Sequence, residues 1–262
     1  MAASRLIARL REHNWVAAII ELAIVVLGIL IALQVSNWNQ DRQDGVRADS
    51  YYRRIHSDLL ADGRNMGVIL AFWSQVSAYG GAAIAYGETG RRVGDSDWKT
   101  VLAFYQASQT MPFEASDASF TEMRSAGALE LIADENLRQR LEDYYSLSGV
   151  GGQSIIRQQD PIYRKEVRGL TPWPVQQYIW SHCFSEASYM TQQFVDCPSP
   201  VSAQTAADIL TAFRSSPTLL NQLRTWMSTL GISEIVLTNS RRDAAKLAAE
   251  VTARRSDGQP LQ

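Results

Sequence analysis

A long apolar run between Trp15 and Trp38 limits what this chain can fold into more than any other feature. The run reads VAAIIELAIVVLGILIALQVSN. A helix that crosses a membrane needs roughly 20 mostly apolar residues, because each residue rises about 1.5 Å and the hydrocarbon core is about 30 Å thick. The run therefore predicts a transmembrane helix over residues 14–38.

Two other interpretations of the apolar run remain open at this point: the buried core helix of a soluble domain, and a cleaved signal peptide. Core helices are usually shorter and amphipathic. A signal peptide has an apolar core of about 7–15 residues, followed by a cleavage site with small residues. No such site follows this run. Both comparisons favour an uncleaved membrane anchor.

The residues inside the run predict how the helix sits and what it contacts. Trp15 and Trp38 are separated by roughly 34 Å of helix, so we expect one indole at each membrane interface. Glu21 is the one ionisable residue of the run, and at about 100° per residue it shares a face with Gly28 and Ala32, with Ser36 close by. Small residues four apart allow another helix to approach closely. We therefore interpret Glu21, Gly28, Ala32 and Ser36 as a helix-pairing stripe; the alternative is that Glu21 extends to the nearer interface and the small residues are incidental.

Charge and cysteine content bound the function of the rest of the chain. The net charge is −2 over 262 residues, which leaves no basic surface of the kind that nucleic-acid binding requires. The two cysteines, Cys183 and Cys197, are predicted to form a disulfide in an oxidising compartment. Two free thiols, or a metal site that includes His182, are the alternatives, although too few further ligands lie nearby for a metal.

The orientation of the anchor is predicted from arginines and cysteines together. Arg5, Arg9 and Arg11 crowd the segment before the run, whereas the arginines after it are interleaved with acids. Arginine counts alone do not decide the orientation. Together with the cysteine pair, they favour a bacterial inner-membrane protein that crosses once, with residues 1–13 as a cytoplasmic tail and the C-terminal domain in the periplasm.

The remaining chain has helical spacing throughout, so we predict an all-α fold in which the transmembrane helix continues into a helical bundle. A membrane-proximal stalk helix is expected over residues 39–86, the bundle over 87–255 and a flexible tail over 256–262. Ser96 and Asp134 are predicted N-caps and Gly127 a C-terminal glycine. We further expect a helix over 97–109 and a helix from about 135 that continues past the glycines at 149–152. A short helix and a surface excursion are expected around the cysteines. A helix over 203–214 and a last helix with Pro217 in its first turn complete the prediction. No sustained strand alternation is found.

The sequence motifs predict no catalytic residue, no cofactor and no metal centre. GVGG at residues 149–152 lacks the strand that a phosphate-binding loop follows. His56 is interpreted as a solvated residue of the stalk. His182 and Glu186 are separated by one helical turn, as an acid–base pair would need, but have no third partner. Arg124, Arg138 and Arg140 are candidate binding residues, more simply explained as the solvated face of packed helices.

Two stretches resemble a known family. IELAIVVLGILIALQVSNWNQDRQD resembles the N-terminal anchor of an uncharacterised family of bacterial single-pass membrane proteins, and FTEMRSAGALELIADENLRQRLEDYY is similar to that family's second recurrent patch. Gln40 stands where the family usually has a glutamate. The resemblance implies an anchored helical protein and adds no reaction.

The expected function is therefore a periplasmic interaction or scaffold module. Its partners are the lipid bilayer and another membrane helix, from a second copy or a different protein. A membrane-tethered enzyme acting on envelope material and a sensory domain that binds a small ligand between its helices are the alternatives. A pocket with converging titratable groups would discriminate the enzyme.

Overall fold

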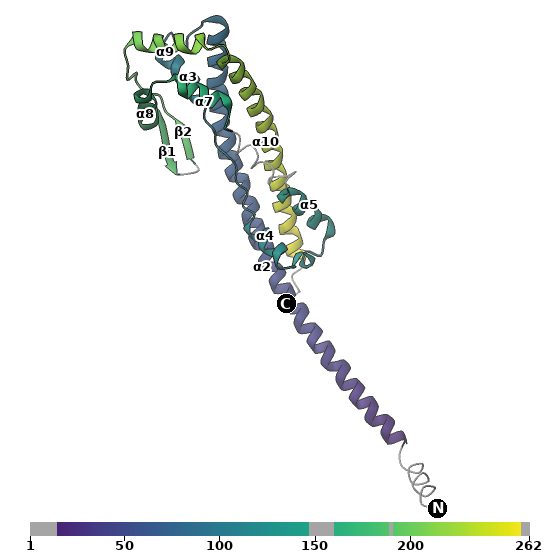
Figure 1. The fold of residues 1–262 in the computed structure, drawn as a ribbon. Coiled ribbons are helices and arrows are strands. Elements are labelled where there is room, and N and C mark those ends of the chain that lie inside the picture. The colour runs from purple at the N-terminus through teal and green to yellow at the C-terminus, as the bar shows by residue number, and fades with distance from the viewer. Residues whose placement is uncertain (1–14, 147–159, 189–190, 258–262) are drawn as a thin grey trace, which may run out of the picture. The chain divides into compact units, whose positions relative to one another are not determined.

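The computed structural model describes residues 15–146, 160–188 and 191–257 (Figure 1). The chain divides into two compact units, residues 1–50 and residues 51–262. The predicted all-α fold is confirmed, with one small hairpin in addition. The elements in order are α2 (Trp15–Thr89), α3 (Asp97–Gln106), α4 (Ala118–Ser125), a 3₁₀ turn η1 (Leu129–Leu131), α5 (Glu135–Tyr145), α7 (Ile162–Leu170), α8 (Trp173–His182), β1 (Phe184–Ser188), β2 (Thr191–Phe194), α9 (Ala203–Ser215) and α10 (Leu219–Asp257).

The first unit contains the N-terminal part of α2. Within the described residues, one helix is long and apolar enough to cross a membrane, with a mean hydropathy of 2.5 over its most apolar window and none of that window buried by protein. Every side chain from Ile19 to Trp38 is exposed. Such a surface suits lipid, where every backbone group of a helix is already hydrogen-bonded internally.

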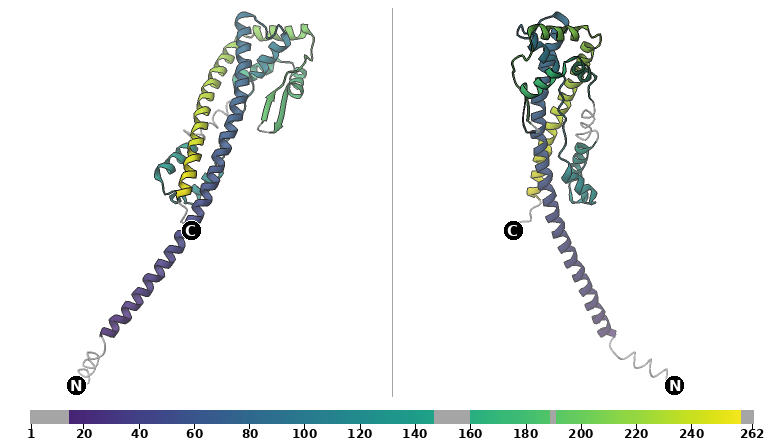
Figure 2. Two further views of the ribbon diagram at one scale, coloured as in Figure 1. Left: turned by 180° about the vertical axis from the view of Figure 1, so that it is seen from behind. Right: turned by 60° about the vertical axis from the view of Figure 1, so that its left-hand side comes forward.

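In the second unit, the later part of α2 lies antiparallel beside α10 (Figures 1 and 2). Polar pairs mark the register: Ser77 donates to Glu234 over 2.9 Å, and Arg224 donates to Glu88 over 2.7 Å. Gly80 lets the two helices approach closely, since a Cβ there would lie 2.0 Å from the Met227 sulfur. The buried apolar residues of α2 between Ile55 and Val76 belong to the hydrophobic core of this unit.

The remaining helices cover this pair. α5 packs against α10, and α3 packs against α9 and α7. The end of α3 and the segment after it are held by three aromatic donors on different helices. The Trp73 indole donates to the Met111 carbonyl over 3.1 Å, Trp226 donates to Ala107 over 2.8 Å, and the Tyr163 hydroxyl donates to Phe104 over 2.7 Å. Each buried ring thereby removes apolar surface from water while its polar atom keeps a partner.

Local capping signals are confirmed. The Ser96 hydroxyl accepts a hydrogen bond from the Lys99 amide over 3.2 Å. The Asp134 carboxylate accepts from the amides of Asn136 and Leu137, over 2.9 and 3.1 Å. Gly127 ends the α4 region with a φ of +65°, a conformation that glycine adopts without steric cost. The stalk helix predicted to end near residue 86 ends at Thr89.

The structure differs from the sequence-based predictions in one added element and in several helix ends. The surface excursion between the cysteines contains an antiparallel hairpin, β1 with β2, in which Phe184 pairs with Phe194. Its strands lack apolar alternation, and Phe194 instead packs on Phe72 of α2, with ring centroids 5.0 Å apart. α3 ends at Gln106 rather than 109, and α10 begins after Pro217 instead of including it. The helix expected to continue from about residue 135 past the glycines ends at Tyr145 instead, because Ser146 is extended. The tail expected from residue 256 begins later, since α10 continues to Asp257. The predicted tail over residues 1–13 and residues 147–159 lie outside the described residues.

Candidate functional site

The predicted helix-pairing stripe lies on a surface that no other part of the described chain covers. Glu21, Gly28, Ala32 and Ser36 are all exposed, and nothing lies within 4 Å of a Cβ built on Gly28. The Trp15 and Trp38 side chains are 73% and 67% exposed. The geometry therefore leaves the stripe free for another helix or for lipid, and pairing itself stays a prediction.

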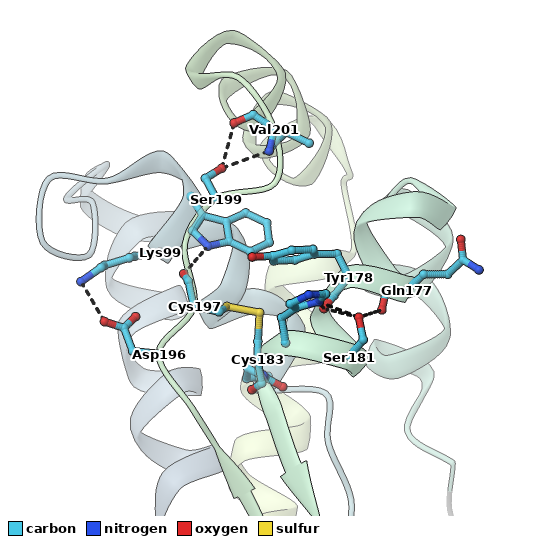
Figure 3. Close-up of a disulfide and its surroundings, with 12 residues drawn as sticks. Lys99, Gln177, Tyr178, Ser181, Cys183, Asp196, Cys197, Ser199 and Val201 are labelled. Carbon is cyan, nitrogen blue, oxygen red and sulfur yellow. Dashed lines mark hydrogen bonds and ion pairs between the residues drawn. A yellow bond between two sulfur atoms is a disulfide. The ribbon is translucent and has the colours of Figure 1, made fainter.

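The two cysteines form a disulfide between Cys183 and Cys197, with their Cα atoms 5.1 Å apart (Figure 3). Cys183 directly follows α8, and the β1–β2 hairpin lies between the two cysteines. Both cysteine carbonyls accept hydrogen bonds from α3: Gln106 donates to Cys183 over 3.2 Å, and the Trp98 indole donates to Cys197 over 3.1 Å. The disulfide thus closes the hairpin while α3 holds both of its ends.

His182 stands beside this disulfide, at the last position of α8. Its ring stacks on Tyr178, with centroids 4.2 Å apart, and its Nδ1 lies 2.7 Å from the Ser181 hydroxyl. α8 ends at His182, and Glu186 lies in β1, so the spacing of one helical turn between them does not exist. The spacing read from the sequence assumed that the helix continued past residue 182. The arrangement leaves His182 as an exposed imidazole stacked on Tyr178.

A buried carboxylate lies at the other end of the second unit. Asp62 of α2 is fully buried; its Oδ1 accepts from the Ser116 amide over 2.7 Å, and its Oδ2 accepts from the Tyr144 hydroxyl over 2.9 Å. Burial raises the pKa of this carboxyl above its ordinary value, while the two hydrogen bonds oppose the rise. The sequence offered no signal for this pair, because Asp62 and Tyr144 are 82 positions apart. We interpret it as a structural link between α2 and α5.

A cleft of about 620 Å³ opens between the start of α7 and the first turns of α10. Its walls combine hydroxyl and amide side chains with the edges of two buried rings, and the residues that line it are Asp160, Pro161, Ile162, Tyr163, Lys165, Thr218, Asn221, Gln222, Thr225, Trp226 and Thr229. The volume suits a small molecule. Among the described residues that line it, Lys165 and Asp160 form an exposed ion pair with their charged atoms 3.8 Å apart. The cleft therefore offers groups for polar recognition of a ligand.

The other candidates from the sequence are surface residues. Arg140 pairs with Glu250 of α10, and Arg138 lies 3.9 Å from Glu135. Arg124 lies over the Phe120 ring at 5.9 Å. Within residues 15–146, 160–188 and 191–257, no group of three or more His, Cys, Asp or Glu side chains could hold a metal ion.

Comparisons with models of protein families, with characterised proteins and with solved structures find no match for this chain. Function must therefore be argued from the geometry of the described residues.

Proposed function

We propose that this chain is a membrane-anchored interaction module of the bacterial envelope, with its helical domain in the periplasm, that pairs through its transmembrane helix. The observation that carries the proposal is the exposed apolar surface of α2 from Ile19 to Trp38, interrupted on one face by Glu21, Gly28 and Ala32. An ionisable side chain in a bilayer is costly, and the usual way to satisfy it is to bury it against another helix. The small residues beside it allow that helix to come close.

The disulfide supports the periplasmic part of the proposal. Disulfides persist in oxidising compartments and are rare in the cytosol of most bacteria. Cys183 is fully buried and Cys197 is 6% exposed, so the bond is shielded from reductants by the hairpin and α3. To test this, cells are quenched in acid, and the denatured protein is treated with a polyethylene-glycol maleimide before and after reduction. Addition of two maleimide groups only after reduction supports the periplasmic assignment. Addition of maleimide before reduction contradicts it.

The pairing is tested with full-length protein in native membranes, by chemical crosslinking of wild type and variants. Glu21→Leu combined with Gly28→Leu should abolish the crosslinked species, because two bulky side chains would keep the partner helix away. Ala23→Leu is the matched control, since position 23 is turned by about 200° from position 21 and faces the opposite side. Unchanged crosslinking in the double variant, or an equal loss with Ala23→Leu, would reject the stripe.

The cleft between α7 and α10 favours a second candidate function, the recognition of a small ligand. Asn221 and Gln222 supply amide groups, and the hydroxyls of Thr225 and Thr229 each donate to a backbone carbonyl within α10, which leaves their oxygens able to accept. Screening small polar metabolites for thermal stabilisation of the wild type, with Asn221→Leu as the control variant, would test this function. A stabilisation that persists in Asn221→Leu would exclude the cleft as the binding site.

A further inference from the structure

Two tryptophans are exposed on one face of α8. Trp173 and Trp180 are seven residues apart, so they point in nearly the same direction from the helix axis. Their side chains are 66% and 39% exposed, and Gln177 between them is exposed as well. Trp173, Gln177 and Trp180 form what we call the α8 aromatic surface. Exposed tryptophans gathered on one face mark a contact surface more often than a solvated one.

The Trp180 ring is held in place by its neighbours. The Arg168 guanidinium carbon lies 5.3 Å from the Trp180 ring centre and 5.4 Å from that of Tyr105, so the cation contacts two aromatic rings. The Phe184 ring meets Trp180 edge-on at 5.3 Å. α7 and α8 are themselves tied together, because Gln176 donates to the Arg168 carbonyl over 2.8 Å. A side chain that is already ordered loses little entropy when a partner binds.

The charge next to this surface is positive and incompletely balanced. α7 carries Arg164, Lys165 and Arg168, whereas α8 carries no acid. The one acid of α7, Glu166, accepts hydrogen bonds from the hydroxyls of Ser216 and Thr218 and so is directed elsewhere. Asp160 lies 3.4 Å from Arg164 and 3.8 Å from Lys165.

Within the described residues, Arg168 is the cation of this group that forms no ion pair with a carboxylate. Its Nη2 donates to the Gln109 side chain over 3.1 Å, while its Nε is buried without a hydrogen-bond partner in the described part of the chain. Burial lowers the pKa of Arg168, and burial together with the Arg168 charge lowers the pKa of Arg164 to about 10. Two cations partly removed from water beside each other are stabilised by an added carboxylate, which a guanidinium binds with well-defined geometry.

We propose that the α8 aromatic surface and Arg168 bind an acidic segment of a partner protein, with an apolar side chain seated on the two indoles. This inference rests on the proposed interaction function and names the surface and the chemistry of the partner. Tryptophan and arginine are the residues that most often dominate binding energy at protein interfaces. An anionic bilayer surface is a poorer fit, because lipid headgroups are attracted by clusters of several exposed lysines and arginines, whereas Arg168 is clamped between rings.

The test places a photo-crosslinking amino acid at Gln177 in the full-length protein in living cells. Gln204 on α9, also an exposed helical glutamine, is the matched control position. We expect an adduct from position 177 alone, and mass spectrometry should map it to a partner peptide that carries Asp or Glu. Trp173→Ala and Arg168→Gln, each introduced into the position-177 protein, should each lower the adduct yield roughly tenfold or more.

Each other result overturns the proposal. Lipid adducts would assign the surface to the bilayer, and adducts with a second copy would assign it to self-association. The absence of any adduct at position 177, a mapped peptide without acids, or equal yield from position 204 would remove the site. Because Trp173 is 66% exposed, its substitution leaves the core intact, so an unchanged yield in Trp173→Ala would also reject the surface without any question of folding. Pairing through the helix-pairing stripe is measured separately, by crosslinking of the Glu21→Leu and Gly28→Leu double variant. Either the pairing or the binding at the α8 aromatic surface can therefore be rejected without the other.

Discussion

Replacing Gly80 with alanine tests the close approach of α2 and α10 on which the second unit is built. A Cβ at position 80 would lie 2.0 Å from the Met227 Sδ and 2.9 Å from its Cγ. Met227 must then adopt another rotamer and lose part of its packing, at a cost of about 1–3 kcal/mol. Alanine also stabilises a helix interior by about 1 kcal/mol relative to glycine. We expect Gly80→Ala to lower the free energy of unfolding by up to about 2 kcal/mol.

Gly81→Ala is the matched control for this prediction. The substitution is identical and the helix is the same, but no atom lies within 4 Å of the added Cβ. It should raise the free energy of unfolding by about 1 kcal/mol. Because both variants share the change in helix propensity, the difference between them, about 1–3 kcal/mol, reports the contact with Met227.

The assay is urea unfolding of the full-length protein in detergent micelles, followed by tryptophan fluorescence. Met227→Ala in the Gly80→Ala background should recover part of the lost stability, because the two sites are in contact and their effects are not additive. Equal stability of Gly80→Ala and Gly81→Ala would refute the packing argument, and with it the register of α2 on α10.

Three further predictions concern buried pairs. Replacing Cys183 and Cys197 together by alanine should lower the free energy of unfolding by about 3 kcal/mol, because the cysteines are 14 positions apart, and reductant should destabilise the wild type but not the variant. Tyr144→Phe removes a hydrogen bond from a buried carboxylate and should cost about 1–3 kcal/mol in a thermal unfolding scan corrected to one temperature. The raised pKa of Asp62 means that the folded chain holds a proton that the unfolded chain has released, so stability attributable to this group falls as pH rises from about 4 towards the raised value. Asp62→Asn should remove that decline in stability. The control Asp196→Asn should keep it, because the Asp196 side chain is 80% exposed. Identical pH profiles of stability for the wild type and both variants would contradict the assignment to Asp62.

Much of the architecture was predictable because its causes are local. The helix that is long and apolar enough to cross a membrane is recognised by length and hydropathy alone, which depend on no other part of the chain. The N-caps Ser96 and Asp134 and the glycine at 127 were found because each side chain or backbone conformation acts within four residues of itself. The start of α10 was predicted two residues too early because only local signals were used. Proline is compatible with positions both before and within a first helical turn, so Pro217 does not distinguish them.

What only the tertiary structure decided involves partners that are far apart in the chain. The β1–β2 hairpin lacks the apolar alternation of a strand and is instead stabilised by the disulfide and by Phe194 packing on Phe72. The buried Asp62 finds its donor 82 positions away, on α5. Arg168 becomes a candidate binding residue only because α3 and α8 bring Tyr105 and Trp180 to its guanidinium. Periodicity reveals which face of a helix is buried, but the identity of the residue opposite depends on how distant helices pack.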